Sequence, residues 1–317
     1  MRIATTTGDF STSWDDYDLY TPDRSDIPKI LGYLAQCGFK YIDFNFCTTV
    51  YKGSPIESDD WQKWAENIGL EAEKLGLEFV QAHSSDSCYN KGEERDYRDS
   101  MIKRELEICK MLGIKGTVVH AICKPDGERN DFIQKNVELY SELLETANKT
   151  GVEVYTENTC TKNCPTYFLV CANDFHELDR ALGKPELFGC CWDVGHAHVQ
   201  GVEQHDEIVA FGDRLKAVHI HDNLSTGDFH MQPYTGNCNF DSVVKGLVDA
   251  NFKGYFTLES FSIPAPKNFL GKKGYVAPDG TIFDKLRDFP LELKLRSERL
   301  MYDTARYMLE TYNCLDE

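Results

Sequence analysis

The chain has 317 residues, 41% of them hydrophobic, so it is long enough to bury a sizeable core in one large domain or two smaller ones. Its formal net charge is -18, from 52 acidic and 34 basic residues. This charge repels polyanions, so it argues against nucleic acid and against an anionic membrane surface as partners.

Short β-branched or aromatic runs alternate along the chain with amphipathic helical stretches. The predicted strands are RIATT (2–6), KYIDFNF (40–46), LEFVQAH (77–83), GTVVH (116–120), VEVYTEN (152–158), LFGCCWDVGH (187–196), LKAVHIHDN (215–223) and GYFTLES (254–260). The predicted helices cover 25–38, 58–76, 96–113, 130–151, 173–183, 205–212, 241–251 and 290–312. Ser58 is the candidate N-cap of the second helix, and Gly76 marks its end.

Eight strands that alternate with helices favour an α/β fold of the (β/α)8 TIM-barrel type over a doubly wound sheet. No repeat or linker marks a second domain, so we expect one domain over residues 1–317. Two connections are unusually long, at about 47–57 and about 260–290. Long loops in a compact domain are typical of lids and binding loops.

The N-terminus and the cysteines indicate in which cellular compartment the protein is expected. The first ten residues contain no apolar stretch of a signal peptide, and no long uncharged span follows, so we expect a cytoplasmic protein without a membrane helix. Several of the 12 cysteines lie in apolar runs, and we expect them to be reduced and mostly buried. Cys160 and Cys164 lack a second pair at zinc-site spacing, so we do not expect them to bind metal.

Side chains able to bind a metal end six of the eight predicted strands, namely His83, His120, Glu157, Asp193, His219 and Glu259. His196, Asp228 and His230 follow the sixth and seventh strands. Each has a structural alternative when taken alone, because a strand-end histidine often makes only hydrogen bonds and an aspartate often caps a helix. A barrel, however, gathers its strand ends on one face, so we expect these side chains to lie together there.

Four further histidines serve as controls, namely His176, His198, His205 and His221. The first lies in a predicted helix, and the next two lie beyond the strand ends. His221 is two residues past His219 and therefore on the same face of an extended segment. We expect His219 to be the ligand, because it ends an apolar run, and His221 to lie in the following loop.

The motifs TEN, WDVGH, VHIHDN followed by DFH, and TLES on the last four strands resemble the xylose isomerase-like TIM barrels. This superfamily includes sugar and sugar-phosphate isomerases and epimerases, inosose dehydratases, and the AP endonuclease family 2 DNA-repair enzymes. The resemblance implies that Glu157, Asp193, His219 and Glu259 hold one catalytic divalent ion. In the DNA-repair branch, positions matching His83, His120, His196, Asp228 and His230 hold two further zinc ions, and sugar-processing relatives keep several of these positions too.

For a sugar isomerase or epimerase, a divalent ion stabilises the enediolate formed when a proton leaves the carbon beside a carbonyl. Glu157 and Glu259 are the candidate catalytic pair that removes and returns this proton. Carboxylate and imidazole ligands suit Mn, Zn, Co or Mg. His83, His120, His196, Asp228 and His230 are then candidates for an additional metal or for substrate hydroxyls.

The rival functions use the same face of the barrel. One is a zinc-dependent AP endonuclease-like phosphodiesterase and the other an inosose dehydratase-like lyase. The strand-end loops are acidic or neutral, which favours a sugar over a DNA duplex. The basic cluster Lys267, Lys272 and Lys273 is a candidate site for one substrate phosphate, and a homo-oligomer is compatible with the sequence.

Two positions depart from the usual pattern of the superfamily. The loop after DFH commonly reads Pro-Gly-x-Gly in relatives but is QPYTGNCNFD here, so this rim of the pocket is expected to differ in shape. The second strand often ends in Glu, whereas here it ends in DFNF, which leaves open whether Asp43 or Asn45 reaches the site.

Overall fold

Eight parallel strands close into a barrel, with β1 paired to both β2 and β8. The computed structural model describes residues 1–10, 26–159, 164–261, 275–283 and 290–316. The barrel strands are β1 (Arg2–Thr6), β2 (Tyr41–Asn45), β3 (Glu78–His83), β4 (Gly116–Val118), β5 (Glu153–Glu157), β6 (Phe188–Asp193), β7 (Leu215–Ile220) and β8 (Tyr255–Leu258).

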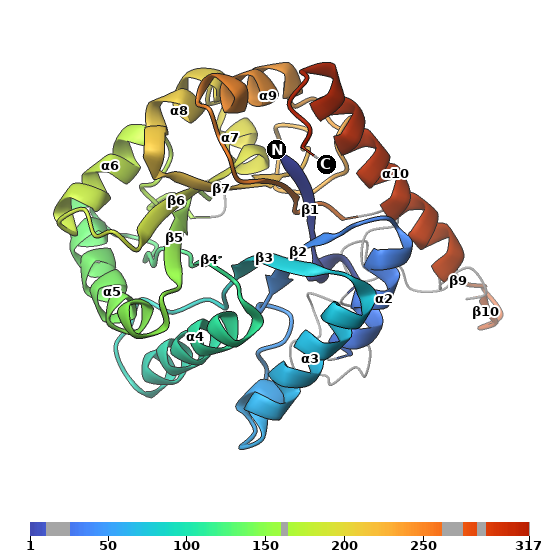
Figure 1. Cartoon of the computed structure of the whole chain (residues 1–317), viewed down its shortest axis with the longest axis horizontal. Coiled ribbons are helices and arrows are strands. Elements are labelled where there is room, and N and C mark those ends of the chain that lie inside the picture. The colour runs from blue at the N-terminus through green and yellow to red at the C-terminus, as the bar shows by residue number, and fades with distance from the viewer. Residues whose placement is uncertain (11–25, 160–163, 262–274, 284–289, 317) are drawn as a thin grey trace.

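Helices surround this barrel on the outside (Figure 1). They are α2 (Ile27–Gln36), α3 (Trp61–Leu75), α4 (Glu93–Leu112), α5 (Arg129–Thr150), α6 (Ala172–Ala181), α7 (Val194–Gln200), α8 (Gln204–Phe211), α9 (Phe240–Asp249) and α10 (Leu291–Thr311), with short 3-10 turns at Thr7–Phe10, Pro55–Glu57 and Gly212–Arg214. The predicted (β/α)8 TIM barrel is therefore confirmed.

Local sequence signals explain where several helices start and stop. The Asp26 carboxylate accepts a hydrogen bond from the backbone N–H of Lys29 at 3.2 Å and so caps α2. Gly76 ends α3 in the left-handed conformation, with φ of 69°, as its sequence position predicts. The predicted N-cap Ser58 is wrong, because α3 begins after Asp60.

The sixth predicted strand is too long, and the reason bears on the site. β6 ends at Asp193, and α7 begins at the next residue. The Asp193 carboxylate accepts a hydrogen bond from the backbone N–H of His196 at 2.6 Å, so it acts as the N-cap of α7. The chain therefore turns immediately after the strand, and His196 lies in the first turn of a helix.

The barrel interior is layered below the site. Val118, Tyr155, Cys191 and Ala217 form a small apolar cluster that is separate from the main core between strands and helices. Because alternate residues of a strand point to the same side, the residue two positions further along each of β5, β6 and β7 lies above this cluster. Those residues are Glu157, Asp193 and His219.

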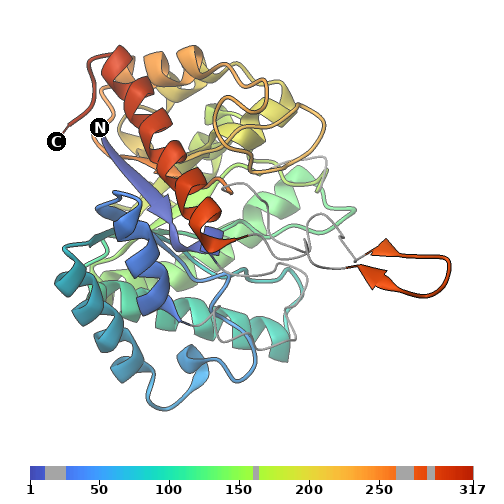
Figure 2. The ribbon, with the colours of Figure 1, turned by 90° about the vertical axis from the view of Figure 1, so that its right-hand side faces the viewer.

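The connection after β8 contains a small hairpin of β9 (Tyr275–Val276) and β10 (Ile282–Phe283), which stands apart from the barrel in Figure 2. Of the predicted long loop at about 260–290, the structure describes residues 260–261, 275–283 and 290. Lys267, Lys272 and Lys273 lie outside the described residues, so the proposed phosphate site stays a prediction.

Cys123 and Cys164 are joined in a disulfide, so the expectation that the cysteines are all reduced is wrong for this pair. These residues follow β4 and β5, which are neighbours in the barrel, and their loops meet there. The other cysteines in the described part of the chain are free. No helix among the described residues is both long and apolar enough to cross a membrane.

Candidate active site

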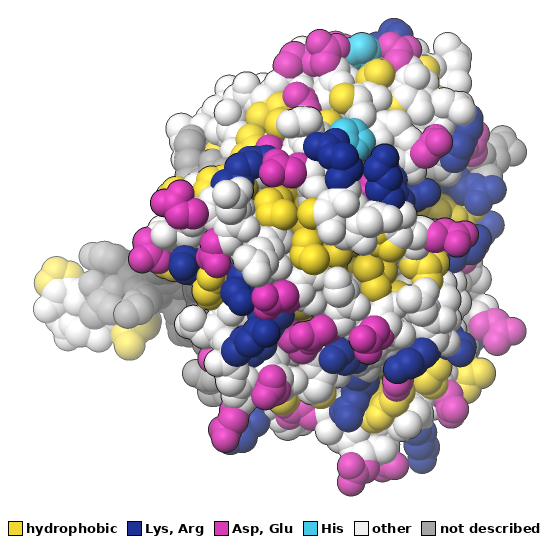
Figure 3. All heavy atoms as spheres, turned by 90° about the vertical axis from the view of Figure 1, so that its left-hand side faces the viewer, with side chains coloured by type: hydrophobic (Ala, Val, Ile, Leu, Met, Phe, Trp, Pro, Cys, Tyr) yellow, Lys and Arg dark blue, Asp and Glu magenta, His cyan; other side chains and the backbone are white. Residues whose placement is uncertain are grey.

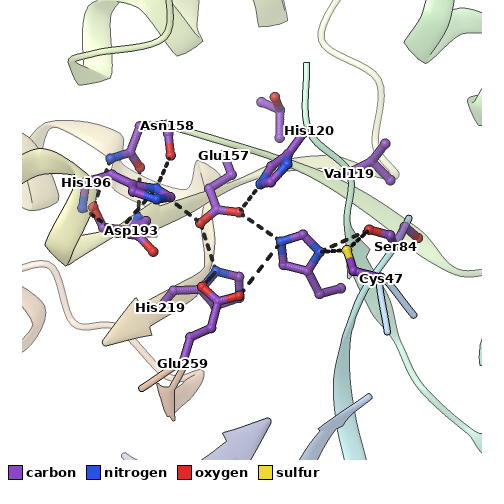
Figure 4. Close-up of polar contacts among 12 residues, drawn as sticks. Cys47, Ser84, Val119, His120, Glu157, Asn158, Asp193, His196, His219 and Glu259 are labelled. Carbon is purple, nitrogen blue, oxygen red and sulfur yellow. Dashed lines mark hydrogen bonds and ion pairs between the residues drawn. The ribbon is translucent and has the colours of Figure 1, made fainter. Parts of the chain in front are cut away.

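Four side chains predicted as metal ligands converge at the mouth of the barrel. Glu157, Asp193, His219 and Glu259, here called the inner cluster, each offer a donor atom, and these atoms all lie within 4.8 Å of one another. The first three are fully buried, and the Glu259 side chain is 13% exposed. Figure 4 shows Glu157 among the imidazoles of His120, His196 and His219.

His219 joins the two glutamates of the inner cluster. Its Nδ1 lies 2.8 Å from Glu157 Oε1 and 3.2 Å from Glu259 Oε2. Its Nε2, on the opposite side of the ring, lies 2.9 Å from the Gln81 amide and 3.5 Å from Asp43 Oδ2. The ring is therefore held from below by polar side chains of β2 and β3, which point its other nitrogen at the two carboxylates.

Asp43 is the residue of β2 that contacts the site, because its carboxylate lies against Gln81 and His219. Asp43 Oδ2 accepts a hydrogen bond from the Gln81 amide at 2.9 Å, and the side chain is almost fully buried. Asn45 instead caps the turn that follows β2, where its side-chain oxygen accepts from the backbone N–H of Thr48 at 3.3 Å. The open choice is thus resolved in favour of Asp43.

Two more groups with metal-binding potential flank the inner cluster. His83 and His120 converge on Glu157, and we call these three residues the flanking cluster. The outer cluster consists of His196, His221, Asp228 and His230. The donor atoms in each cluster also lie within 4.8 Å of one another.

The flanking imidazoles direct their Nε2 atoms toward a carboxylate. His83 Nδ1 lies 3.0 Å from the carbonyl oxygen of Ser84, and His120 Nδ1 lies 2.9 Å from a carboxylate oxygen of Asp86. Each acceptor requires a proton on Nδ1, so in the neutral rings Nε2 carries a lone pair. The two Nε2 atoms face Glu157 Oε2 at 3.4 and 3.2 Å.

The outer cluster repeats this arrangement. His196 Nδ1 donates to the carbonyl of Asn158 and His230 Nδ1 to the carbonyl of Glu259, at 2.9 and 2.8 Å. Their Nε2 atoms then face Asp228 Oδ2 at 3.1 and 3.4 Å. Asp228 Oδ1 is buried and has no hydrogen-bond partner among the described residues. His230 adopts this position with φ of 44°, a conformation that costs energy in a residue with a side chain.

An imidazole nitrogen that faces a carboxylate requires a positive charge between them, which either a proton or a metal ion supplies, so the donor set fits a divalent cation. Histidine ligands of metals characteristically donate their second ring nitrogen to a carbonyl or carboxylate, as these rings do. The mixture of imidazole nitrogen and carboxylate oxygen suits first-row divalent ions, including Mn, Zn and Co.

The carboxylates and imidazoles of these clusters also shift one another's pKa values. Burial raises the pKa of Glu157, but the surrounding imidazoles, His219 foremost, hold this pKa well below its usual value. The pKa of Glu259 is lowered in the same way, again chiefly by His219 against the effect of burial. Burial lowers the pKa of His230, but Asp228 outweighs it and raises this pKa to about 9. The carboxylates are therefore ionised at neutral pH and attract positive charge.

Local backbone contacts fix the strand ends relative to each other. Two hydrogen bonds of 2.8 Å join the Asn158 side chain to the backbone of Asp193. Asn158 Nδ2 donates to the Asp193 carbonyl, and Asn158 Oδ1 accepts from the Asp193 N–H. The backbone carbonyl of Asn158 also accepts a hydrogen bond from Nδ1 of the His196 ring. The TEN motif of β5 thus positions both the carboxylate that ends β6 and the first histidine of α7.

His221 follows β7, as expected, but the structure corrects the expectation that it lies away from the site. This residue is fully buried in the outer cluster, and its Nε2 lies 2.9 and 3.0 Å from the two carboxylate oxygens of Asp193. It reaches the site because it lies directly after β7 and two residues past His219, and alternate residues of an extended segment point to the same side. The other three control histidines contact residues outside the clusters: His176 contacts Ala210, His198 contacts Asn237, and His205 contacts Asp206 and Asp249.

Sequence reasoning also missed Gln81, which lies two residues before His83. The alternation of side chains along β3 is the signal that could have found it, because residues 81 and 83 point to the same side. Asp86 was missed because it follows β3 in a loop, where no periodicity predicts its position.

Carboxylates and histidines clustered at the C-terminal mouth of a (β/α)8 barrel are typical of metal-binding barrel proteins. Similarity to known proteins identifies the family. The model of the xylose isomerase-like TIM barrel family matches residues 31–276, well over half of the chain. The chain therefore belongs to the xylose isomerase-like TIM barrel family, as its motifs indicate.

Two curated relatives match parts of the chain. Fructoselysine 3-epimerase of Escherichia coli O157:H7 is 26% identical over 176 residues, which cover 53% of this chain and 61% of the relative. The uncharacterised protein y4fM of Sinorhizobium fredii is 23% identical over 182 residues, 55% of each protein. The chain thus spans 55% to 61% of the length of these relatives.

Solved structures resemble the whole barrel. D-psicose 3-epimerase of Clostridium cellulolyticum H10, solved with D-tagatose, superimposes with a TM-score of 0.71 over 98% of this chain and 99% of its own, at 14% identity. The 3-keto-D-glucoside 4-epimerase of E. coli gives a TM-score of 0.64 over 84% and 94%, at 19% identity. At such identities the likeness shows the fold alone.

Proposed function

We propose that this protein is a divalent-metal-dependent sugar or sugar-phosphate epimerase or isomerase that works through an enediolate. The observation that carries the proposal is the inner cluster, in which three carboxylates and an imidazole nitrogen converge within 4.8 Å at the mouth of a barrel. Relatives in sequence and in fold are named as epimerases of fructoselysine, D-psicose and a 3-keto-D-glucoside. A small sugar or sugar derivative is therefore the proposed substrate.

Glu157, Asp193, His219 and Glu259 would hold the ion. Bound there, a divalent ion supplies Lewis acidity that stabilises negative charge on the oxygens of the substrate. Asp43 and Gln81 orient the His219 ring from below, so that Nδ1 points into the mouth. The Asn158 side chain fixes the backbone at Asp193.

Glu157 and Glu259 are the proposed proton carriers. They approach His219 Nδ1 from β5 and from the residue after β8, at 2.8 and 3.2 Å. Because neighbouring histidines lower the pKa of both carboxyls, both are ionised and able to accept a proton from the carbon beside a carbonyl. One removes the proton and the other returns it, on the opposite face for epimerisation. His196 and His230 would orient the substrate hydroxyls.

Deuterium exchange tests this proposal. Ketohexoses and ketopentoses incubated with the protein and Mn²⁺ in deuterated water are expected to gain a carbon-bound deuterium, which NMR detects. Glu157→Gln and Glu259→Gln should each lower the exchange rate by at least about a hundredfold, because the variant side chain cannot accept the proton. His205→Gln, on the outside of the barrel, is the matched control and should exchange at the wild-type rate.

Exchange that survives in both glutamine variants would contradict the roles of Glu157 and Glu259. A wild-type protein that exchanges no sugar in a panel including fructoselysine and 3-keto-glucosides would contradict the epimerase proposal itself. Release of water with formation of a new carbonyl compound would instead support the lyase alternative.

A zinc-dependent phosphodiesterase is the second candidate, because the flanking and outer clusters supply ligands for two further ions. Elemental analysis of the purified full chain distinguishes the two. We expect about one divalent ion per chain for the epimerase, and close to three zinc ions would favour the phosphodiesterase. The outer side of the barrel shown in Figure 3 intermixes acidic with basic side chains. The loops that follow the strands are acidic or neutral in sequence, whereas a duplex requires a basic stripe, and this favours the epimerase.

A further inference from the structure

His221 belongs to the outer cluster and also contacts Asp193 of the inner cluster. It follows β7 directly and is fully buried. Its Nε2 lies 2.9 Å from Asp193 Oδ1 and 3.0 Å from Asp193 Oδ2. Its ring stacks on that of His230, with the centroids 4.0 Å apart and the planes 13° from parallel. A residue with no contact to the site would show neither interaction.

The hydrogen bonds around Asn223 determine which nitrogen of His221 is protonated. Asn223 Oδ1 accepts a hydrogen bond from the backbone N–H of Phe229 at 2.6 Å, so the amide Nδ2 of Asn223 points the other way. This Nδ2 lies 3.5 Å from His221 Nδ1. An amide nitrogen only donates, so Nδ1 accepts, and the proton of the neutral ring is on Nε2, where it is donated to Asp193.

Asp193 is thereby held by two donors. The backbone N–H of His196 donates to Oδ1 at 2.6 Å, and the His221 ring spans both oxygens. Each carboxylate oxygen has two acceptor positions, so Asp193 keeps lone pairs for an ion. The rotamer of this fully buried carboxylate is fixed before any ion binds, which reduces the conformational freedom lost on binding.

We propose that His221 is a positioning residue, which donates its Nε2–H to Asp193 and so sets the affinity of the inner cluster for a divalent ion. This inference rests on the proposed metal dependence. His221 itself makes no contact with the ion and acts through the Asp193 carboxylate.

Two substitutions separate hydrogen bonding from packing. His221→Phe keeps a ring that can stack on His230 but has no N–H, whereas His221→Gln keeps a donor near the position of Nε2 but has no ring. The control is His198→Phe on α7, where the wild-type ring contacts Asn237 and Ser225 outside the clusters. Each full-length protein is stripped with a chelator, and Co²⁺ is titrated back while visible absorption and calorimetry are recorded.

We expect His221→Phe to weaken Co²⁺ binding roughly ten- to a hundredfold and to alter the visible absorption of the bound ion, as loss of outer-shell donors does in metal sites. His221→Gln should bind within about threefold of wild type, and His198→Phe should match wild type in both readouts. Thermal unfolding of the stripped proteins identifies any variant that is merely unstable.

Wild-type affinity and spectrum in His221→Phe would overturn the inference and leave the proposed function intact. Equal losses in His221→Phe and His221→Gln would also overturn it, since packing and not donation would then be the cause. A wild-type chain that binds no Co²⁺ would contradict the proposed metal-dependent function, and the positioning role with it.

Discussion

At the scale of single residues, Gly195 and His221 constrain each other at the mouth of the barrel. Gly195, between Asp193 and His196, has the His221 ring packed against its Cα. A Cβ at this position would lie 2.0 Å from His221 Cε1 and 2.2 Å from Nδ1. Only glycine leaves room there, which explains the glycine of the WDVGH motif.

Gly195→Ala tests this close contact. We expect the substitution to displace the His221 ring and to lower the free energy of unfolding by roughly 1–3 kcal/mol, which is typical of overpacking a buried site. Urea unfolding of the metal-free protein measures the change. Gly32→Ala is the matched control, because a Cβ on Gly32 of α2 meets nothing within 4 Å. Alanine favours a helix over glycine, so this variant should be as stable as wild type or slightly more stable.

An unfolding free energy in Gly195→Ala equal to that of Gly32→Ala would show that the His221 ring moves aside without cost. The orientation attributed to His221 would then be too weakly held to position Asp193.

At the scale of elements, α4 places a carboxyl under the loop that follows β3. Glu105 is fully buried, and its carboxylate accepts hydrogen bonds from the Ser85 hydroxyl at 2.5 Å and the Ser85 backbone N–H at 3.1 Å. Burial raises the pKa of Glu105 to about 7, although these hydrogen bonds lower it in part. Helix α4 is therefore tied to the end of β3, two residues past His83.

This raised pKa predicts a pH dependence of stability. The folded protein binds a proton at Glu105 up to about pH 7, whereas an unfolded chain releases it near pH 4.5. The stabilisation is thus fully present below pH 4.5 and is lost as the pH rises through 7. Between pH 4 and pH 8, the unfolding free energy of wild type should fall relative to Glu105→Gln by about 3 kcal/mol.

Chemical unfolding of both metal-free proteins across this range gives the difference directly. Glu107→Gln, on the exposed face of the same helix, controls for the loss of one negative charge. A constant difference between wild type and Glu105→Gln at all pH values would refute the protonation of Glu105 in the folded state.

At the scale of the whole molecule, the number and order of the barrel strands followed from the sequence because hydrophobic periodicity reports burial along the chain. Helix α7 and the β9–β10 hairpin were not predicted. Barrel closure then brings Glu157 and Glu259, which are about a hundred residues apart, against one histidine. The inner cluster was predictable because a parallel barrel places the C-terminal end of every strand on the same face.

Other features depended on contacts that periodicity does not encode. His221 was expected outside the site, yet the space beside Gly195 admits its ring. Asp86 reaches His120 from a loop, and the disulfide joins cysteines on two neighbouring loops. Loop conformation and the fit between non-adjacent side chains decide these contacts, and both appear only once the chain is folded.

We infer that barrel closure builds a cation site from Glu157, Asp193, His219 and Glu259. The most direct measurement is anomalous diffraction at the manganese edge from crystals of the full chain grown with Mn²⁺. We predict a strong anomalous peak among these four side chains, with donor atoms at roughly 2.0–2.4 Å. A map without a peak there, or with manganese bound only elsewhere while the four side chains keep their positions, would contradict the claim.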